Sequence, residues 1–255
     1  MRHRLIVGNW KMYSTAATAR RLATAVVRGL GSETRVRVAL CPPGPYLGAV
    51  GEVLTGTPVA LGAQTVYPET EGAFTGETGI GMLLDLGCRY VIVGHSERRH
   101  LLGENDQFIN RKVHAAAAAG IDVILCVGEL LEQRQRGETK ACLESQMTGA
   151  MAGLTAEQVR RVVVAYEPVW AIGTGVNAAP EQAQQSAADI RDLFRERFGE
   201  TTANDVVILD GGSVNSANAA TLMHRPDIDG LLIGHASLDA DEFLNIVCAA
   251  LRTED

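Results

Sequence analysis

Eight short apolar runs, rich in β-branched residues and separated by longer segments, constrain the fold of this chain more than any other feature. Most of the runs are continuously apolar, which is typical of parallel strands that are buried on both faces. Strands and helices in alternation imply βαβ units with right-handed crossovers. The expected strands are Leu5–Gly8, Val36–Leu40, Val59–Gly62, Tyr90–Val93, Val123–Val127, Val162–Tyr166, Val206–Leu209 and Leu231–Ile233.

Four of the segments between or after these runs carry signals of helix boundaries. Glycine directly after a periodic apolar segment is typical of a helix C-terminus, and proline is favoured in the first turn of a helix. The expected helices are Thr15–Leu30, which Gly31 follows, Asn105–Ala119, which Gly120 follows, Pro180–Phe198, which Gly199 follows, and Asp239–Leu251 at the end of the chain.

The length of the chain favours a single barrel. The chain has 255 residues, and α/β barrels commonly have about 250. The sequence contains no low-complexity segment, no linker-like stretch and no block of like charges. We therefore expect one domain over residues 1–255, a closed eight-fold (β/α) barrel. An open, doubly wound sheet is the alternative, because periodicity alone does not exclude it.

Charge and cysteine content exclude several classes of protein. The net charge of −7 argues against a broad surface for nucleic acid or for an acidic membrane. The apolar run near the N-terminus breaks at Asn9 and Lys11, too early for the core of a signal peptide. No apolar run reaches the roughly 18 residues of a membrane span. The five cysteines are scattered without a C-x-x-C pair, which is typical of reduced thiols in the cytoplasm.

Polar, ionisable and glycine-rich residues follow five of the expected strands. In parallel α/β folds, ligands bind at the carboxyl ends of the strands. Any one of these groups could be a solvated side chain or a tight turn, but chance would scatter them over both ends. In strand order, the groups are Asn9 with Lys11, His95 within Gly94–Arg99, Glu167, Gly211–Ser213 and Gly234–Ser237.

These groups together indicate an acid–base site beside a phosphate cradle. Glu167 is a candidate base, and His95 and Lys11 are candidate donors, a combination that suits proton transfer next to a carbonyl. Backbone N–H groups at glycine turns and helix N-termini attract anions. His95 and His100 are five residues apart, off the spacing of two ligands on one helix face. We expect no metal and no cofactor.

Six segments resemble one known family in order and spacing over essentially the whole chain. The matching segments are Asn9–Met12, Gly72–Glu77, Gly94–Arg99, Cys126–Glu129, Ala165–Gly175 and Gly211–Val214. The two most specific segments are Gly94–Arg99 and Ala165–Gly175. The chain is similar to the triosephosphate isomerase family, and the resemblance implies an α/β fold, a single-domain (β/α)8 TIM barrel.

The resemblance implies an activity and a set of catalytic residues. The activity would be interconversion of dihydroxyacetone phosphate and D-glyceraldehyde 3-phosphate. Glu167 would move a proton between two carbons, and His95 would polarise the carbonyl on the way to an enediolate-like intermediate. Lys11 and Asn9 would stabilise the developing negative charge and contact the substrate.

The resemblance also implies how the substrate is held. The loop from Pro168 to about Ala178 would close over the substrate. The family is dimeric, and Thr75 would reach the neighbouring subunit's site near Asn9 and His95. The expected partners are therefore a small phosphorylated sugar and a second copy of the chain. Backbone N–H groups would bind the phosphate at Gly173, Ser213, Gly234 and His235.

Several positions depart from the family pattern near the expected phosphate site. Asp210 stands where the family usually has tyrosine, His235 stands where it has glycine, and Val176-Asn177 replaces Lys-Thr. Neutral variation in a triosephosphate isomerase is the first hypothesis. The second is an isomerase of a four-carbon keto-sugar phosphate such as erythrulose phosphate. A weakly catalytic sugar-phosphate binding protein is the third.

Overall fold

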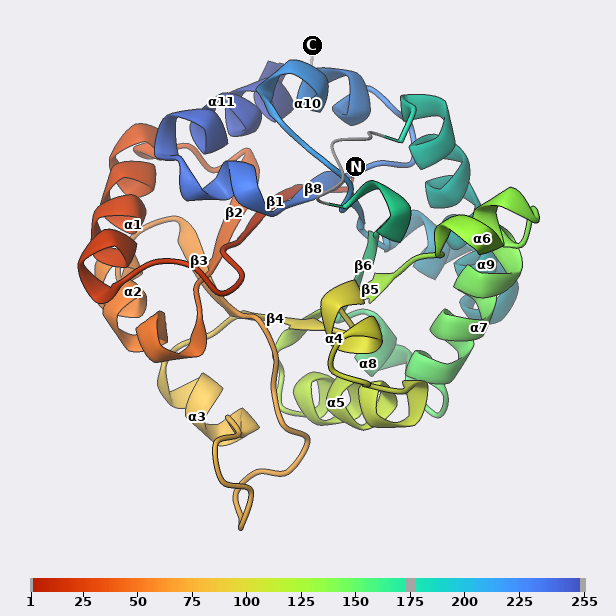
Figure 1. Cartoon of the computed structure of the whole chain (residues 1–255), viewed down its shortest axis with the longest axis horizontal. Helices are drawn as coiled ribbons and strands as arrows, with labels where there is room; N and C mark the ends of the chain where they lie inside the picture. Colours follow the sequence, from red (N-terminus) through yellow and green to blue (C-terminus); the bar gives the residue numbers. More distant parts are fainter. Residues whose placement is uncertain (1, 173–177, 253–255) are drawn as a thin grey trace.

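Eight parallel strands close into a barrel in the computed structural model, which describes residues 2–172 and 178–252 (Figure 1). The strands pair in chain order, and the last pairs with the first in the register Leu5 to Gly230. A Cβ atom at Gly230 would lie 1.9 Å from the carbonyl oxygen of Leu5, so this strand pairing requires glycine. The barrel confirms the predicted fold, and the open sheet is wrong. The strands are β1 (Arg4–Asn9), β2 (Val36–Cys41), β3 (Val59–Ala63), β4 (Tyr90–Val93), β5 (Asp122–Val127), β6 (Val162–Tyr166), β7 (Ile208–Asp210) and β8 (Gly230–Ile233).

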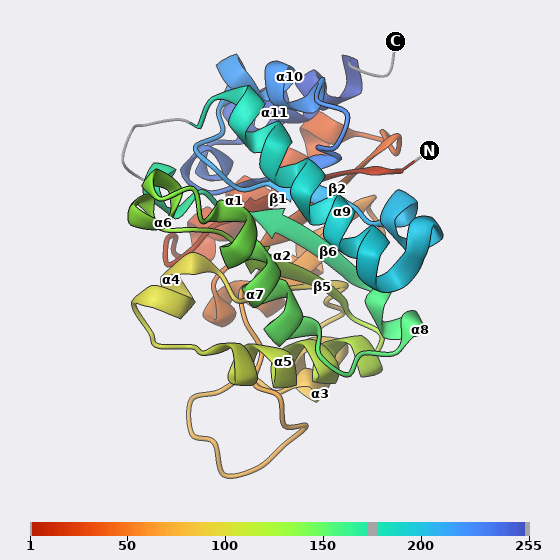
Figure 2. The same ribbon diagram turned by 90° about the vertical axis from the view of Figure 1, so that its right-hand side faces the viewer.

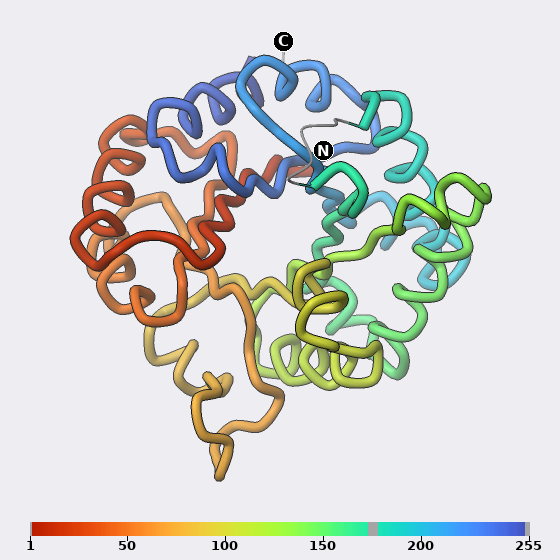
Figure 3. The backbone as a smooth tube through the Cα atoms, in the orientation of Figure 1, coloured from red at the N-terminus to blue at the C-terminus, as the bar shows by residue number. Residues whose placement is uncertain are grey.

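Helices form an outer ring around the barrel, as the backbone trace shows (Figure 3). Short 3₁₀ helices lie at η1 (Gly44–Tyr46), η2 (Val169–Ala171) and η3 (His235–Leu238). The α-helices of the described residues are α1 (Ala16–Leu30), α2 (Leu47–Leu54), α3 (Ile80–Asp85), α4 (Ser96–His100), α5 (Asp106–Ala118), α6 (Leu131–Gln135), α7 (Thr139–Met151), α8 (Ala156–Val159), α9 (Pro180–Asp205), α10 (Ser216–Met223) and α11 (Ala240–Leu251).

All four helices predicted from boundary signals are present. Thr15, Asn105 and Asp239 are N-caps whose side chains accept hydrogen bonds from backbone N–H groups of α1, α5 and α11. Each of these helices therefore begins one residue later than predicted. Gly199, with φ of 84°, interrupts α9 where the sequence predicted its end, and a further helical stretch follows.

Two layers of apolar side chains explain why the strands are continuously apolar. Leu5 and Val7 of β1 belong to the inner cluster, which takes one residue or more from each of the other strands; β3 contributes the partly buried Ala60. Ile6, between them, belongs to the larger cluster that packs strands against helices. A strand in this position has no polar face, so the absence of alternation in the sequence is a consequence of the barrel.

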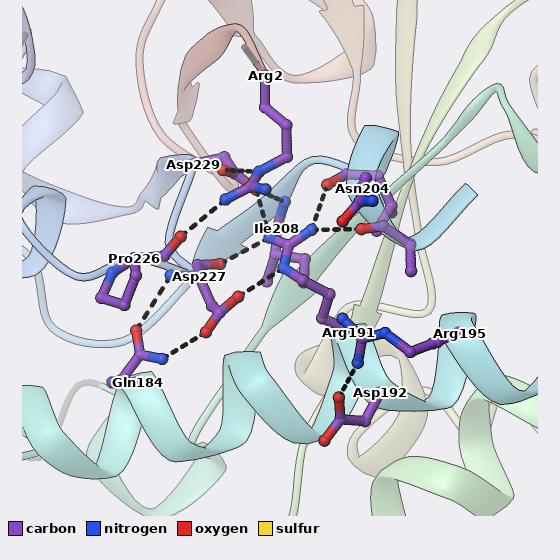
Figure 4. A network of polar contacts seen from close by, with 12 residues as sticks. Arg2, Gln184, Arg191, Asp192, Arg195, Asn204, Ile208, Pro226, Asp227 and Asp229 are labelled. Atoms are coloured by element: carbon purple, nitrogen blue, oxygen red, sulfur yellow. Dashed lines mark hydrogen bonds and ion pairs between the residues drawn. The ribbon is translucent and has the colours of Figure 1, made fainter. Parts of the chain in front are cut away.

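A buried ion network joins α9 to β7 and to the loop before β8 (Figure 4). The Arg191 guanidinium lies 2.6 Å from Asp227 Oδ1 and 2.8 Å from Asp229 Oδ2, and it also donates to backbone carbonyls. Asp229 Oδ2 in turn accepts a hydrogen bond from the backbone N–H of Ile208, the first residue of β7. Arg2 pairs with the other oxygen of Asp229. The network ties the start of the chain, α9 and β7 together.

Replacing Arg191 by Met is expected to lower the free energy of unfolding by about 3–5 kcal/mol, because the half-buried Asp227 loses its cation and the buried Asp229 keeps only its pair with Arg2. Urea unfolding followed by circular dichroism measures the change. Arg195→Met on the same helix is the matched control, because its pairs with Asp192 and Glu200 are exposed. Such pairs contribute about 1 kcal/mol or less. Equal effects of the two substitutions would contradict the importance of the network.

A long loop between β3 and α3, residues 64–79, extends beyond the ring of helices (Figures 1 and 2). Within it, the rings of Tyr67 and Phe74 lie 4.3 Å apart, and the N–H of Tyr67 donates to the carbonyl of Thr78. The loop is thus held by contacts within itself and by the packing of Tyr67 on Phe108 of α5. In the part of the chain that the structure describes, no helix is long and apolar enough to span a bilayer.

Candidate active site

One cavity at the carboxyl ends of the strands brings the predicted site residues together. Its volume is about 860 Å³. Gly173, the remaining predicted residue, lies outside the described residues, as do positions 174–177 of the expected closing loop. Ile172 and the turn after β7 also line the cavity. The predicted residues that line it are Asn9, Lys11, His95, Glu167, Ser213, Gly234 and His235.

Glu167 and His95 form a direct pair at the base of this cavity. Glu167 follows the last residue of β6 and is 2% exposed. Its Oε1 lies 3.0 Å from Nε2 of His95, and its Oε2 accepts a hydrogen bond of 2.8 Å from the backbone N–H of Ser96. The carboxylate is therefore held by one side chain and by the first residue of α4.

The tautomer of His95 follows from its second hydrogen bond. His95 caps α4, and its Nδ1 accepts from the backbone N–H of Glu97 at 3.2 Å. A ring nitrogen that accepts carries no proton, so the imidazole is neutral and its proton lies on Nε2. The N–H of His95 consequently points at Glu167 and into the cavity.

Two glycines hold the backbone and side chain of Glu167 from opposite sides. A Cβ atom at Gly128, directly after β5, would lie 1.7 Å from the carbonyl oxygen of Glu167. A Cβ atom at Gly211, directly after β7, would lie 3.0 Å from Cγ of Glu167. The N–H of Glu167 donates to the carbonyl of Val127 at 2.8 Å, which anchors it to β5. Neither glycine can gain a side chain without moving Glu167.

Lys11 reaches the cavity from a left-handed backbone conformation. Its φ is 50°, which is uncommon for a residue other than glycine. Asn9 Oδ1 accepts from the N–H of Lys11 at 3.0 Å, and the side-chain amide of Gln64 donates to its carbonyl at 2.8 Å. These two bonds hold the strained residue. The ammonium lies 2.7 Å from a carboxylate oxygen of Glu97.

The glycine-rich turns after β7 and β8 lie beside Lys11. A Cβ atom at Gly234 would lie 3.3 Å from Cε of Lys11, so the absence of a side chain lets the lysine cross the turn. Ser213 donates its hydroxyl to the carbonyl of Ala171 in η2, which links the turn after β7 to the segment after β6. The His235 ring lies edge-on to Tyr13, with centroids 6.4 Å apart.

Sequence reasoning missed several residues that support the site. Glu97, which pairs with Lys11, lies inside the segment Gly94–Arg99 but was given no role. Ser96 acts through its backbone N–H, and the type of side chain does not reveal such a contact. Gln64 follows β3, so the rule that located the other groups could have found it. Glu129 accepts hydrogen bonds from Tyr166 and Trp170, and it thereby holds η2.

A parallel eight-stranded barrel with ionisable groups at the carboxyl ends of its strands defines a (β/α)8-barrel enzyme. The family model described as triosephosphate isomerase matches residues 4–250. The chain belongs to the triosephosphate isomerase family.

Proteins named triosephosphate isomerase from several bacteria are similar to the chain over nearly their whole length. The protein from Roseiflexus sp. (strain RS-1) is 51% identical over 247 residues, which cover 97% of each chain. That of Rhodopirellula baltica is 48% identical over 96% of this chain and 97% of its own. That of Carboxydothermus hydrogenoformans is 49% identical over 97% of this chain and 98% of its own.

Proposed function

We propose that the protein is an isomerase that interconverts dihydroxyacetone phosphate and D-glyceraldehyde 3-phosphate. The observation that carries this proposal is the contact of 3.0 Å between His95 Nε2 and Glu167 Oε1 at the carboxyl ends of β4 and β6. Identities near 50% to proteins named triosephosphate isomerase support the choice of reaction.

Glu167 acts as the base in this proposal. It removes a proton from the carbon next to the carbonyl and returns it to the neighbouring carbon, so that one group serves both directions. In the structure its oxygens accept from His95 and Ser96. The substrate must replace one of these contacts.

His95 and Lys11 stabilise the charge that develops on the substrate oxygens. The proton on Nε2 of His95 faces the cavity and can donate to the carbonyl oxygen as it becomes an enediolate. Lys11 supplies a positive charge at the same mouth, and Asn9 holds its backbone. Donors fixed before the reaction need no reorganisation when charge develops, and each is worth roughly 10²- to 10³-fold in kcat.

The phosphate is held at the turns after β7 and β8, where Ser213, Gly234 and His235 line the cavity. Backbone N–H groups at glycine-rich turns bind anions without a net positive surface, in keeping with the acidic chain. Gly173, which lies outside the described residues, stays a prediction from the resemblance.

The ratio of kcat/KM on glyceraldehyde 3-phosphate and on an erythrulose phosphate, measured with one preparation, tests the proposal. We expect the triose phosphate to be preferred by orders of magnitude. A preference for the four-carbon substrate would replace the proposed reaction with its alternative. Binding of both without turnover would instead indicate a sugar-phosphate binding protein.

We also propose that the protein is a cytoplasmic homodimer. The five cysteines are free, and Cys248 is exposed, which suits a reducing compartment. Exposed apolar side chains support a second copy as partner. Met12 and Tyr13 lie next to Lys11 and are 92% and 53% exposed. Phe74 is also exposed on the long loop, beside Thr75.

Replacing Thr75 by Arg is expected to convert the dimer to a monomer and to lower activity about tenfold or more, because a large cation at an interface core is desolvated without a partner. Light scattering after size-exclusion chromatography measures the mass. Thr34→Arg, at an exposed position between α1 and β2, is the control. A wild-type chain that is monomeric and fully active at micromolar concentration would refute the dimer.

A further inference from the structure

Asp210 is a buried carboxyl at the edge of the candidate phosphate site. It is the last residue of β7, directly before the turn Gly211–Ser213, and it is 4% exposed. Its side chain does not line the cavity, whereas the three residues that follow it, Gly211–Ser213, do. The charge of this group therefore acts on the cavity through the turn and not by contact.

The two carboxyl oxygens of Asp210 have unequal surroundings. Oδ2 accepts a hydrogen bond of 3.3 Å from the backbone N–H of Gly212, and a Cβ atom at Gly212 would lie 3.4 Å from that oxygen. Oδ1 is buried and has no hydrogen-bond partner among the described residues. An N–H of the anion-binding turn is thus directed at a carboxyl group, and the second oxygen has room for a proton.

Among the described residues, no cation pairs with this carboxyl. Burial raises the pKa of Asp210 to about 7, and the bond from Gly212 opposes the rise only in part. The Glu167 carboxylate, which follows the neighbouring strand β6, faces His95 and Ser96, and Lys11 is paired with Glu97. Four other titratable groups on or beside the elements around β7 also have contacts away from Asp210: Tyr166 bonds to Glu129, Glu181 pairs with Arg225, Arg191 pairs with Asp227, and His235 lies against Tyr13.

We propose that Asp210 is a positioning residue that couples phosphate binding to the uptake of one proton. The inference rests on the proposed function, because it requires an anion at the turns after β7 and β8. A dianion bound there meets the Asp210 carboxylate as a like charge in a dry environment, where such repulsion is poorly screened. Protonation of Asp210 removes the repulsion. The neutral carboxyl also no longer needs the hydrogen bond from the Gly212 N–H to stabilise a charge.

The sign of the pH dependence follows from linkage. The bound anion favours the protonated carboxyl, so the pKa of Asp210 is higher in the complex than in the free protein. Affinity is therefore full below pH 7, where the free protein already carries the proton, and it falls as the pH rises through about 7. The phosphate itself loses its second proton near pH 6, so the fall above pH 7 belongs to the protein.

Calorimetric titration of the wild-type protein with glycerol 3-phosphate, in buffers of different ionisation enthalpy, measures proton uptake directly. At pH 8, one unit above the pKa of the free carboxyl, we expect about 0.9 protons per ligand. Uptake below about 0.2 protons would overturn the inference. This measurement needs no variant, so it does not depend on whether a substitution folds.

Asp210→Asn, and Asp210→Ser as a second variant, test whether Asp210 is the group. From pH 7 to 8.5, we expect the Kd for glycerol 3-phosphate to rise about tenfold or more in the wild type and less than about threefold in either variant. Equal slopes would overturn the inference. Turnover of glyceraldehyde 3-phosphate by the same wild-type preparation separates the two proposals. No turnover sinks the proposed function, whereas turnover with equal slopes sinks only the role of Asp210.

Discussion

Glu167→Gln is expected to lower kcat on glyceraldehyde 3-phosphate by about 10²- to 10⁴-fold, the range of a positioned general base. Glutamine has nearly the same shape, and its carbonyl oxygen can still accept from Ser96, so the fold and the cavity stay in place. What is lost is the ability to take a proton. We therefore expect KM to change little, because the phosphate site lies at other strand ends.

Steady-state kinetics of Glu167→Gln, a control variant and the wild type, run in parallel, measure the change in kcat. Glu132→Gln is the matched control, because Glu132 lies on α6 with its side chain 82% exposed. It should leave kcat within about twofold of the wild type. Activity of Glu167→Gln within a few-fold of wild type would falsify the role of Glu167 as base.

Lys11→Met is expected to lower kcat/KM by about 10²- to 10³-fold, because it removes a fixed cation from a site that binds a dianion and forms an enediolate. Methionine keeps most of the aliphatic length of the side chain that crosses Gly234. The left-handed backbone of residue 11 is held through main-chain atoms by Asn9 and Gln64, so the substitution leaves that support intact.

Lys140→Met, at an exposed position of α7, is the control for loss of one positive charge from an acidic chain. Kinetics at low and high ionic strength separate long-range attraction from a local contact, since salt screens the former. If Lys11→Met and Lys140→Met have similar effects, Lys11 acts on the whole-molecule field and not on the bound substrate.

The strands were predictable because the barrel buries them on both sides. Residues such as Leu5, Ile6 and Val7 must all be apolar, so each strand shows in the sequence as consecutive apolar residues.

Helix α7 was not predicted, because its apolar pattern is weak. Its buried side chains are Leu143, Met147, Ala150 and Met151, and the small and polar residues between them make its period weak.

The candidate site was predictable where it is formed by side chains at strand ends, and not where it is formed by the backbone. Glu167, His95 and Lys11 could be found because a closed parallel barrel gathers its strand ends. The backbone N–H of Ser96 that holds Glu167 would be present whatever residue stood at position 96, so the sequence does not reveal it. The burial of Asp210 likewise depends on the turn that covers it, and the sequence shows only an aspartate before two glycines.

The pair of glycines around Glu167 sets a limit on how this enzyme can be redesigned. Gly128 and Gly211 carry no functional group, yet any larger residue at either position would push against Glu167. A library that keeps every ionisable residue and varies its neighbours would therefore lose most of its active members at these two positions. For this barrel, the space around the Glu167 carboxylate is as necessary to the site as the carboxylate itself.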